Sequence, residues 1–331
     1  MKKIVSIVLA VSMLAVCVTG CKTTTRKQLK PVVLNEVAHS IFYAPQYAAI
    51  ELGYFEDEGL DLTLVNGAGA DKVMTALISG DADIGFMGSE ASIYVYQQGS
   101  DDYAVNFAQL TQRAGNFLVG READSDFTWA DLKGKKVLGG RAGGMPEMVF
   151  EYILKKNGID PSTDLTIDQS INFGLTAAAF TSSDADYTVE FEPFATGLEK
   201  EGNGHVIASL GVDSGYVPYT AYSVKKSYLE KNPDTIQKFT NAIQKGLEYV
   251  NTHSAEEIAK VIQPQFKETA EDTIATIVGR YKDQDTWKDD TVFEQDSFEL
   301  LENILEEAGE LNERVPYDKL VTTEFSQEAA K

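Results

Sequence analysis

Two acidic side chains in one short segment are the clearest candidates for binding chemistry in this sequence. The segment 187–193, YTVEFEP, alternates Glu190 and Glu192 with apolar residues, so a strand here would carry both acids on one face. Glu192 also falls where that strand would end, beside a helix that Pro193 can open. Carboxylates accept hydrogen bonds from amino-heterocycles and pair with cations. We therefore expect Glu190 and Glu192 to contact a ligand.

Other candidates lie mostly where apolar strands give way to turns and helices. Phe42 and Tyr43 carry flat rings that can stack on an aromatic ligand. Glycines in such turns either let the backbone approach a ligand or simply shape the turn, and both readings stay open. An acid in the first turn of a helix is likewise favoured by the helix dipole without any ligand. The remaining candidate binding residues are His39, Gly67, Gly69, Gly88, Ser89, Glu90, Arg113, Gly143, Gly144 and Met145.

Motifs for catalysis or cofactor binding are weak. Gly67-Ala68-Gly69 begins like a dinucleotide fingerprint, but Lys72 stands where the third glycine belongs. The chain has no Walker A, G-x-S-x-G or H-E-x-x-H motif, and DQDTWKDD (283–290) lacks the glycine and glutamate of an EF-hand. The 3 histidines are scattered, and of these only His39 is placed near the other candidates. We expect no cofactor, no metal and no catalytic residue.

The elements that must position these residues occur twice. SGDADIGFMGSEAS (79–92) and SSDADYTVEFEPFA (182–195) both read as a turn, a short apolar strand and a helix, and Ser89 could cap the first helix. The segments around each also follow the same order of strands and helices. Alternating strands and helices favour parallel sheets with right-handed crossovers. We predict two similar α/β halves with ligands at the carboxyl ends of their strands.

The chain changes character after about residue 216 and becomes helical. Ile236, Phe239, Ile243, Leu247 and Val250 fall on one helix face, and Ser254 with Glu257 forms a capping box for the next helix. Without strands of their own, these helices are expected to pack on the first α/β half. The predicted division is a first lobe of residues 31–113 plus 217–331 and a second lobe of residues 114–216.

The N-terminal segment reads as an export signal. Residues 4–18 form an uncharged run that is short for a membrane span, and VTGC (18–21) resembles a bacterial lipobox. We expect a signal peptide over residues 1–20, a lipid on Cys21 and a polar tether over residues 21–30. The protein would then sit on the extracytoplasmic face of the cell membrane. A formal net charge of −22 argues against nucleic acid as a partner.

Longer stretches of the sequence resemble a known family. Residues 47–60, YAAIELGYFEDEGL, followed by GDADIG (80–85), and the segments QLTQRAGNFLVGR (109–121) and VPYDKL (315–320) are similar to substrate-binding lipoproteins of ABC importers. The branch they resemble includes binders of alkanesulfonates, nitrate and thiamine-pyrimidine precursors. The resemblance implies a two-lobed α/β periplasmic-binding-protein fold of type II, with a mostly parallel sheet in each lobe and a ligand cleft between them. It also implies an ABC permease as partner, and we expect a monomeric protein. Hinges are expected near residues 112–115 and 212–218, where glycine and a proline flank the crossings between the lobes.

The ligand is predicted from the balance of charge at the candidate edges. Carboxylates outnumber arginines there, which favours a neutral or cationic heterocycle such as an aminopyrimidine or thiamine-like compound over an alkanesulfonate. Two other classes of function remain. A thiamine-pyrimidine synthase of similar fold would use a histidine where Tyr43 stands and a cysteine-rich run, and neither is present. A sensory solute-binding lobe is compatible with the same sequence.

Overall fold

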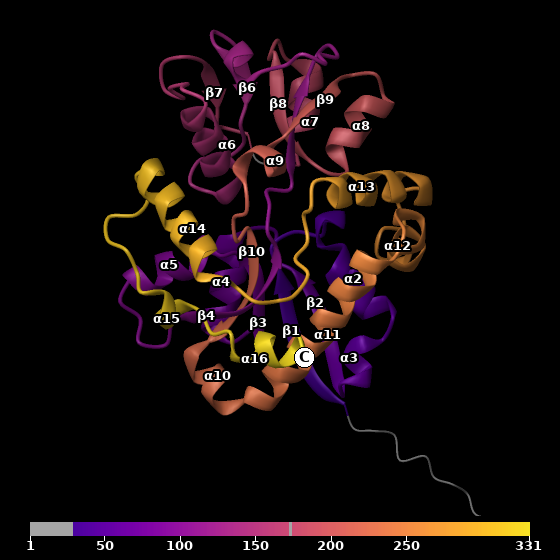
Figure 1. Ribbon diagram of the computed structural model, residues 1–331, viewed down its shortest axis with the longest axis vertical. Coiled ribbons are helices and arrows are strands. Elements are labelled where there is room, and N and C mark those ends of the chain that lie inside the picture. The colour runs from indigo at the N-terminus through magenta and orange to yellow at the C-terminus, as the bar shows by residue number, and fades with distance from the viewer. Residues whose placement is uncertain (1–28, 172–173) are drawn as a thin grey trace, which may run out of the picture.

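The computed structural model describes residues 29–171 and 174–331 and contains two five-stranded sheets, one above the other along the long axis (Figure 1). The signal peptide, Cys21 and nearly all of the tether that the sequence predicts lie outside these residues. The first sheet has the order β2-β1-β3-β10-β4, and the second has the order β7-β6-β8-β5-β9. The shared strand order agrees with the prediction of two similar α/β halves. We call each sheet with its covering helices the first and the second lobe.

The strands of the first sheet are β1 (Lys30–Glu36), β2 (Leu60–Asn66), β3 (Ile84–Gly88), β4 (Ala104–Thr111) and β10 (Thr220–Lys225). Those of the second sheet are β5 (Asn116–Gly120), β6 (Lys136–Leu138), β7 (Thr166–Asp168), β8 (Tyr187–Phe191) and β9 (His205–Ser209). β1 pairs in parallel with β2 and β3, and β6 pairs in parallel with β7 and β8. In each sheet one strand runs antiparallel to both neighbours, namely β10 and β5. Each sheet is therefore mixed, with four strands in one direction and one in the other, which agrees with the prediction that most strands of each lobe run parallel.

The chain passes between the sheets in two places. β4 of the first sheet is followed by β5 of the second, and β9 of the second is followed, after α9 (Leu210–Ser214), by β10 of the first. Both antiparallel strands thus come directly after a crossing. Within the crossings the backbone is closely packed, because a Cβ added to Gly115 would lie 2.6 Å from the Phe42 ring. A Cβ on Gly211 would lie 2.4 Å from the carbonyl oxygen of Ala114.

Helices cover both sheets, and those after β10 return to the first lobe (Figure 1). All five apolar residues predicted to share a face of α11 (Pro233–Thr252) are fully buried, and this helix packs against α2 (Ala44–Glu51). The Ser254–Glu257 capping box of α12 is present as predicted. The remaining helices are η1 (Ile41–Tyr43), α2 (Ala44–Glu51), α3 (Tyr54–Asp57), α4 (Ala70–Ser79), α5 (Glu90–Gln97), η2 (Trp129–Leu132), α6 (Met145–Lys156), α7 (Thr176–Ser182), α8 (Phe194–Lys200), α10 (Lys226–Lys231), α11 (Pro233–Thr252), α12 (Ala255–Ile262), η3 (Gln263–Gln265), α13 (Glu271–Asp283), α14 (Gln295–Ala308), α15 (Tyr317–Leu320) and α16 (Glu324–Ala329).

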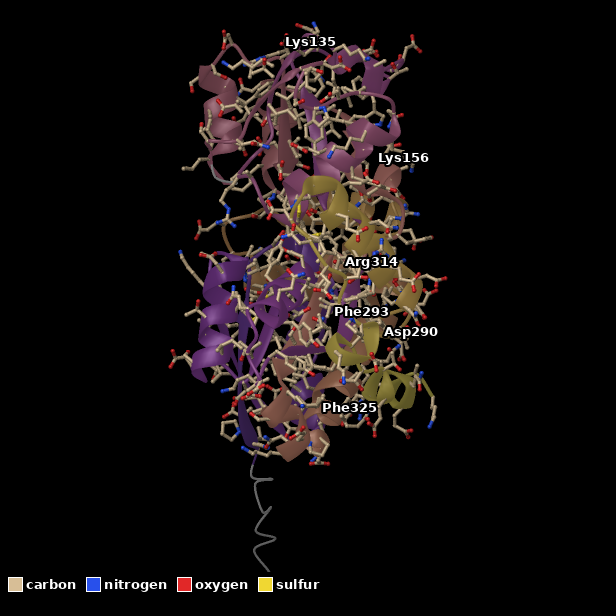
Figure 2. All side chains as sticks on the ribbon, turned by 90° about the vertical axis from the view of Figure 1, so that its left-hand side faces the viewer. Lys135, Lys156, Asp290, Phe293, Arg314 and Phe325 are labelled. Carbon is tan, nitrogen blue, oxygen red and sulfur yellow. The ribbon has the colours of Figure 1, made fainter. Side chains whose placement is uncertain are left out.

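Two C-terminal helices also reach the second lobe, beyond what the sequence predicts. α14 packs against α6, and Lys155 Nζ donates to the carbonyl oxygen of Glu307 at 2.7 Å. α13 meets the end of β8 through Arg280, described below. Figure 2 shows the two lobes from the side, with Lys135 in the upper one and Phe325 in the lower one. Among the helices described, none is long and apolar enough to cross a membrane.

Candidate ligand-binding cleft

A cluster of aromatic side chains lies at the junction of the two lobes. The Phe42 ring lies 5.2 Å from Tyr43, 5.7 Å from Tyr219 and 5.2 Å from Tyr281 between ring centroids. It also lies 6.4 Å from Phe191 at the end of β8 in the second sheet. η1 places Phe42 and Tyr43 there because Ser40 caps this short helix, its side chain accepting from the Phe42 backbone N–H. Rings from both lobes and one crossing therefore meet at the carboxyl ends of the strands.

Glu90 enters the same junction as the first residue of α5. Its side chain is 5% exposed, and the Oε2 atom meets no hydrogen-bond partner. Burial raises the pKa of Glu90 to about 7, while the backbone N–H groups of Glu90 and Met145 and the charge of Arg141 act in the opposite direction. Met145 begins α6 of the second lobe, so Glu90 touches both lobes. The Glu90 charge also raises the pKa of Tyr43 and Tyr219, after the larger effect of burial.

Ser89 does not cap α5, contrary to the sequence prediction. Its hydroxyl instead donates to the carbonyl oxygen of Pro218 in the second crossing, a contact between residues far apart in the chain. Gly88, the last residue of β3, lies against the Glu90 carboxylate, because an added Cβ there would fall 2.1 Å from a carboxylate oxygen. Both residues thus help to bring Glu90 and the second crossing together.

The carboxylates of Glu190 in β8 and of Glu192, the residue after β8, already have partners. Glu190 is buried and accepts hydrogen bonds from Thr176 at 2.9 Å and Thr188 at 2.6 Å. Burial raises the pKa of Glu190 to about 7, and the two hydroxyls lower it. Glu192, which is fully buried, accepts from the Thr196 backbone and hydroxyl and pairs with Arg280 Nη1 at 2.8 Å.

Arg280 therefore connects the lobes from α13. The same guanidinium also pairs with Glu199 of α8 through Nη2. The side chain of Glu192 is 0% exposed, so its charge is compensated inside the protein by Arg280. This ion pair was not foreseen from the sequence, since 88 residues separate its members.

His39 and Arg113 are held by neighbouring groups. His39 Nδ1 contacts Glu36 Oε1 at 2.7 Å and Nε2 contacts the Gln265 carbonyl at 3.0 Å. The hydrogen bond to Glu36 raises the pKa of His39, with burial opposing it. Arg113 Nη1 donates to the carbonyl of Gly211 at 3.0 Å, and its guanidinium lies over the Tyr216 ring. Arg113 thus joins the two crossings, and its buried Nε has no partner.

The glycine candidates divide between turns and close contacts. Gly143 has a φ of 77° and its N–H donates to Glu147 Oε2 at 3.1 Å, which organises the turn before Gly144 and α6. Gly69 has a φ of 144° before α4. Gly67 lies close to the side chain of Asn35, where an added Cβ would fall 2.6 Å from Oδ1.

Sequence reasoning did not nominate Tyr219, Asn116 or Arg280. Tyr219 is 3% exposed and its hydroxyl has no partner, and neither atom of the buried Asn116 amide has one. Asn116 lies opposite Phe191 in the β5–β8 pairing. Both residues adjoin a crossing, so their position next to the predicted hinges was the signal available in the sequence.

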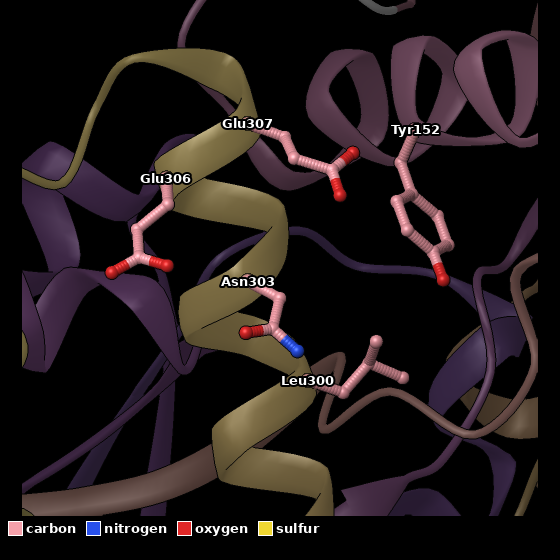
Figure 3. Close-up of a pocket in the computed structure, with 5 residues that line it drawn as sticks. All are labelled: Tyr152, Leu300, Asn303, Glu306 and Glu307. Atoms are coloured by element: carbon pink, nitrogen blue, oxygen red, sulfur yellow. The ribbon is translucent and has the colours of Figure 1, made fainter.

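A separate surface cavity of about 340 Å³ lies between α14 and α6 (Figure 3). None of the residues nominated from the sequence lines it. Glu306 at its edge is bound by Arg314. The cavity is lined by Tyr152, Leu300, Asn303, Glu306 and Glu307. In the residues described, no cluster of His, Cys, Asp and Glu is arranged to hold a metal ion.

Comparison with known proteins places the chain in a family. It is 47% identical over 308 residues to the putative binding protein YtlA of Bacillus subtilis, covering 93% of this chain and 92% of that one. It is 26% identical over 229 residues to the 4-amino-5-hydroxymethyl-2-methylpyrimidine phosphate synthase THI11 of Saccharomyces cerevisiae, covering 63% of each chain. The alkanesulfonate-binding protein SsuA of Xanthomonas axonopodis pv. citri, solved with MOPS, superposes with a TM-score of 0.70 at 15% identity, covering 89% of this chain and 99% of that one. This likeness confirms the two-lobed periplasmic-binding-protein fold. The family model described as NMT1/THI5 like matches residues 41–257, and the chain belongs to this family.

Proposed function

We propose that the protein is a solute-binding protein that delivers a small organic compound to an ABC import permease. The observation that carries this proposal is the buried group of Phe42, Tyr43 and Tyr219 where the two lobes meet. Periplasmic-binding folds trap ligands between lobes, and a ligand that touches both lobes stabilises the closed form through those differential contacts. The identity to YtlA over nearly the whole chain supports a binding role.

The proposed ligand is a neutral or cationic aromatic heterocycle, with an aminopyrimidine or thiamine-like compound first. Flat rings suit the stacking surfaces of Phe42 and Tyr43. Glu192 is not assigned to the ligand, because Arg280 and Thr196 bind both of its carboxylate oxygens. Glu190 can accept a hydrogen bond from a ligand only if that ligand displaces Thr176 or Thr188. An alkanesulfonate is the second candidate, supported by the fold shared with SsuA.

A thermal-shift screen tests the proposal. The panel pairs 4-amino-5-hydroxymethyl-2-methylpyrimidine and thiamine with short alkanesulfonates. A ligand at about 100 times its dissociation constant adds about 2.7 kcal/mol to the free energy of unfolding. We expect stabilisation by the pyrimidines. Stabilisation by sulfonates alone would reject the heterocycle and keep the solute-binding function, and no response to any solute would count against binding itself.

Catalysis is not part of the proposal, although synthases belong to the same family. The junction has aromatic rings, carboxylates and Asn116, and His39 is engaged by Glu36 and Gln265. A synthase would convert a bound precursor into a different compound. The protein is incubated with each compound of the thermal-shift panel. Mass spectrometry of the protein and of the recovered compound should then show that both are unchanged.

The proposed lobes are residues 31–113 with 217–331 and residues 114–216, in a monomer that bends at the two crossings.

We propose that the protein lies on the extracytoplasmic face of the cell membrane, where a lipid on Cys21 anchors it after removal of residues 1–20. Two acyl chains give stable anchoring where one is marginal. The variant Cys21→Ala should leave the membrane fraction, and its retention there after a salt wash would reject the anchor. A gene for a permease beside this one would favour transport, and one for a histidine kinase would favour sensing.

A further inference from the structure

A single carboxylate oxygen is buried without a partner in the part of the chain that the structure describes, and it belongs to Glu90. The other acids of the junction are satisfied, since Glu190 accepts from two threonines and Glu192 pairs with Arg280. Burying a carboxylate without full pairing destabilises the folded protein. The position of Glu90 in the first turn of α5 and the nearby Met145 N–H compensate part of this cost, but no donor reaches Oε2.

The hydroxyl of Tyr219 is another unpartnered group at the junction, as is the amide of Asn116. β10 runs antiparallel to β3 with Thr220 opposite Gly88, so Tyr219 lies beside the residues that follow β3. The Ser89 hydroxyl donates to the Pro218 carbonyl and fixes this approach. Tyr219 is 3% exposed, and the Glu90 charge is near enough to raise its pKa, after the larger effect of burial.

These two groups offer complementary hydrogen-bonding chemistry. Ionised Glu90 can only accept a hydrogen bond, whereas the Tyr219 hydroxyl can also donate one. A ligand edge with an N–H group next to an acceptor nitrogen would satisfy both. An anion such as a sulfonate would instead meet the negative charge of Glu90 in a site of low dielectric.

We infer that Glu90 Oε2 and the Tyr219 hydroxyl together recognise an amino group next to a ring nitrogen on a flat heterocycle. This inference rests on the proposed solute-binding function and narrows its ligand class. The Phe42 ring, which lies 5.7 Å from the Tyr219 ring and 5.2 Å from the Tyr43 ring between centroids, would together with Tyr43 contact the faces of such a ring.

The test compares two pyrimidines that differ only in the amino group. Binding of 4-amino-5-hydroxymethyl-2-methylpyrimidine and of 5-hydroxymethyl-2-methylpyrimidine to the full mature protein is measured by calorimetry at pH 8. The wild type should prefer the amino compound by about tenfold to a hundredfold, the worth of a hydrogen bond to a charged group. Glu90→Met should abolish this preference, and Glu90→Gln, whose amide oxygen still accepts, should keep part of it.

Two further variants separate recognition from folding. Tyr219→Phe should weaken both pyrimidines and keep the preference, because the ring nitrogen is common to both. Glu302→Gln is the matched control, since Glu302 is a buried acid of α14 that accepts from the Val315 N–H at 2.7 Å, and it should bind both compounds as the wild type does.

Equal binding of the two pyrimidines by the wild type, or an undiminished preference in Glu90→Met, would overturn the inference. Binding of an alkanesulfonate but of neither pyrimidine would also overturn it while the solute-binding function stands. Failure of every solute to bind would reject both.

Discussion

At the scale of single residues, the acids of the junction differ in how they are satisfied. Glu192 has Arg280, Glu190 has two threonine hydroxyls, and Glu90 has an oxygen atom with no partner. Sequence reasoning favoured Glu190 and Glu192 over Glu90, whereas in the structure Glu90 is the one of the three that has a buried oxygen without a partner. Their ranking depends on Arg280 and Tyr219, which reach the site from distant parts of the chain and leave no local pattern.

The raised pKa of Glu90 predicts how stability varies with pH. Because the folded protein holds this proton up to a pKa of about 7, against an ordinary value of 4.5, the folded state binds more protons than the unfolded state in that window. The contribution of Glu90 is therefore most favourable below pH 4.5 and is lost as the pH rises to 7. Arg141 is the charged group that lowers the pKa of Glu90, and the Glu90 charge in turn raises the pKa of Tyr43, Tyr94 and Tyr219, after the larger effect of burial.

Glu90→Gln removes this titration. The difference in melting temperature between Glu90→Gln and the wild type should become more positive from pH 4.5 to pH 7 and then level off. Scanning calorimetry at several pH values measures it. A difference that stays constant across this range would show that Glu90 is not buried as a charge.

At the scale of elements, the contact between α11 and α2 depends on a glycine. A Cβ added to Gly246 would fall 2.2 Å from the carbonyl oxygen of Pro45, and this backbone atom cannot move aside alone. Alanine is otherwise the better helix former by about 1 kcal/mol. We expect the clash to dominate, so that Gly246→Ala lowers the free energy of unfolding by about 1–3 kcal/mol in urea denaturation.

Gly279 of α13 provides the matched control for that substitution. It is also helical, and an added Cβ would meet nothing within 4 Å. Gly279→Ala should therefore leave stability unchanged or raise it by up to about 1 kcal/mol. Equal effects of the two substitutions would contradict the close packing of α11 on α2.

The ion pair between α13 and the second lobe gives another prediction at this scale. Arg280→Met leaves the fully buried Glu192 without its cation and should destabilise the protein by about 3 kcal/mol. Arg314→Met, which removes an exposed pair with Glu306, should change stability little. Urea denaturation of both variants decides between them, and similar effects would mean that Glu192 is compensated by solvent.

Elements with a strong local signal were predictable from the sequence. The buried face of α11 and the capping box of α12 depend on residues within one or two helical turns. The prediction that Ser89 caps a helix was wrong, because its hydroxyl donates to the Pro218 carbonyl oxygen, 129 residues away in the chain. The contacts of α13 and α14 with the second lobe were missed for the same reason, since packing between lobes is not encoded in periodicity.

At the scale of the whole molecule, the two lobes meet along three lines of contact. α14 packs on α6 at one side, Glu90 meets the start of α6 in the middle, and Arg280 joins Glu192 and Glu199 at the other side. The crossings between the lobes are close to one another, because Arg113 of the first donates to Gly211 of the second. A solute bound near Glu90 would add to the contacts between the lobes that α14 and Arg280 already make.

The central claim is that a solute binds between the lobes and holds them together. Small-angle X-ray scattering measures this directly as the radius of gyration of the mature protein, with and without a saturating concentration of the solute that gives the largest thermal shift. We predict that the solute decreases the radius of gyration and that Arg280→Met increases it in the absence of solute. A solute that binds tightly while the radius of gyration stays the same in both proteins would contradict the claim.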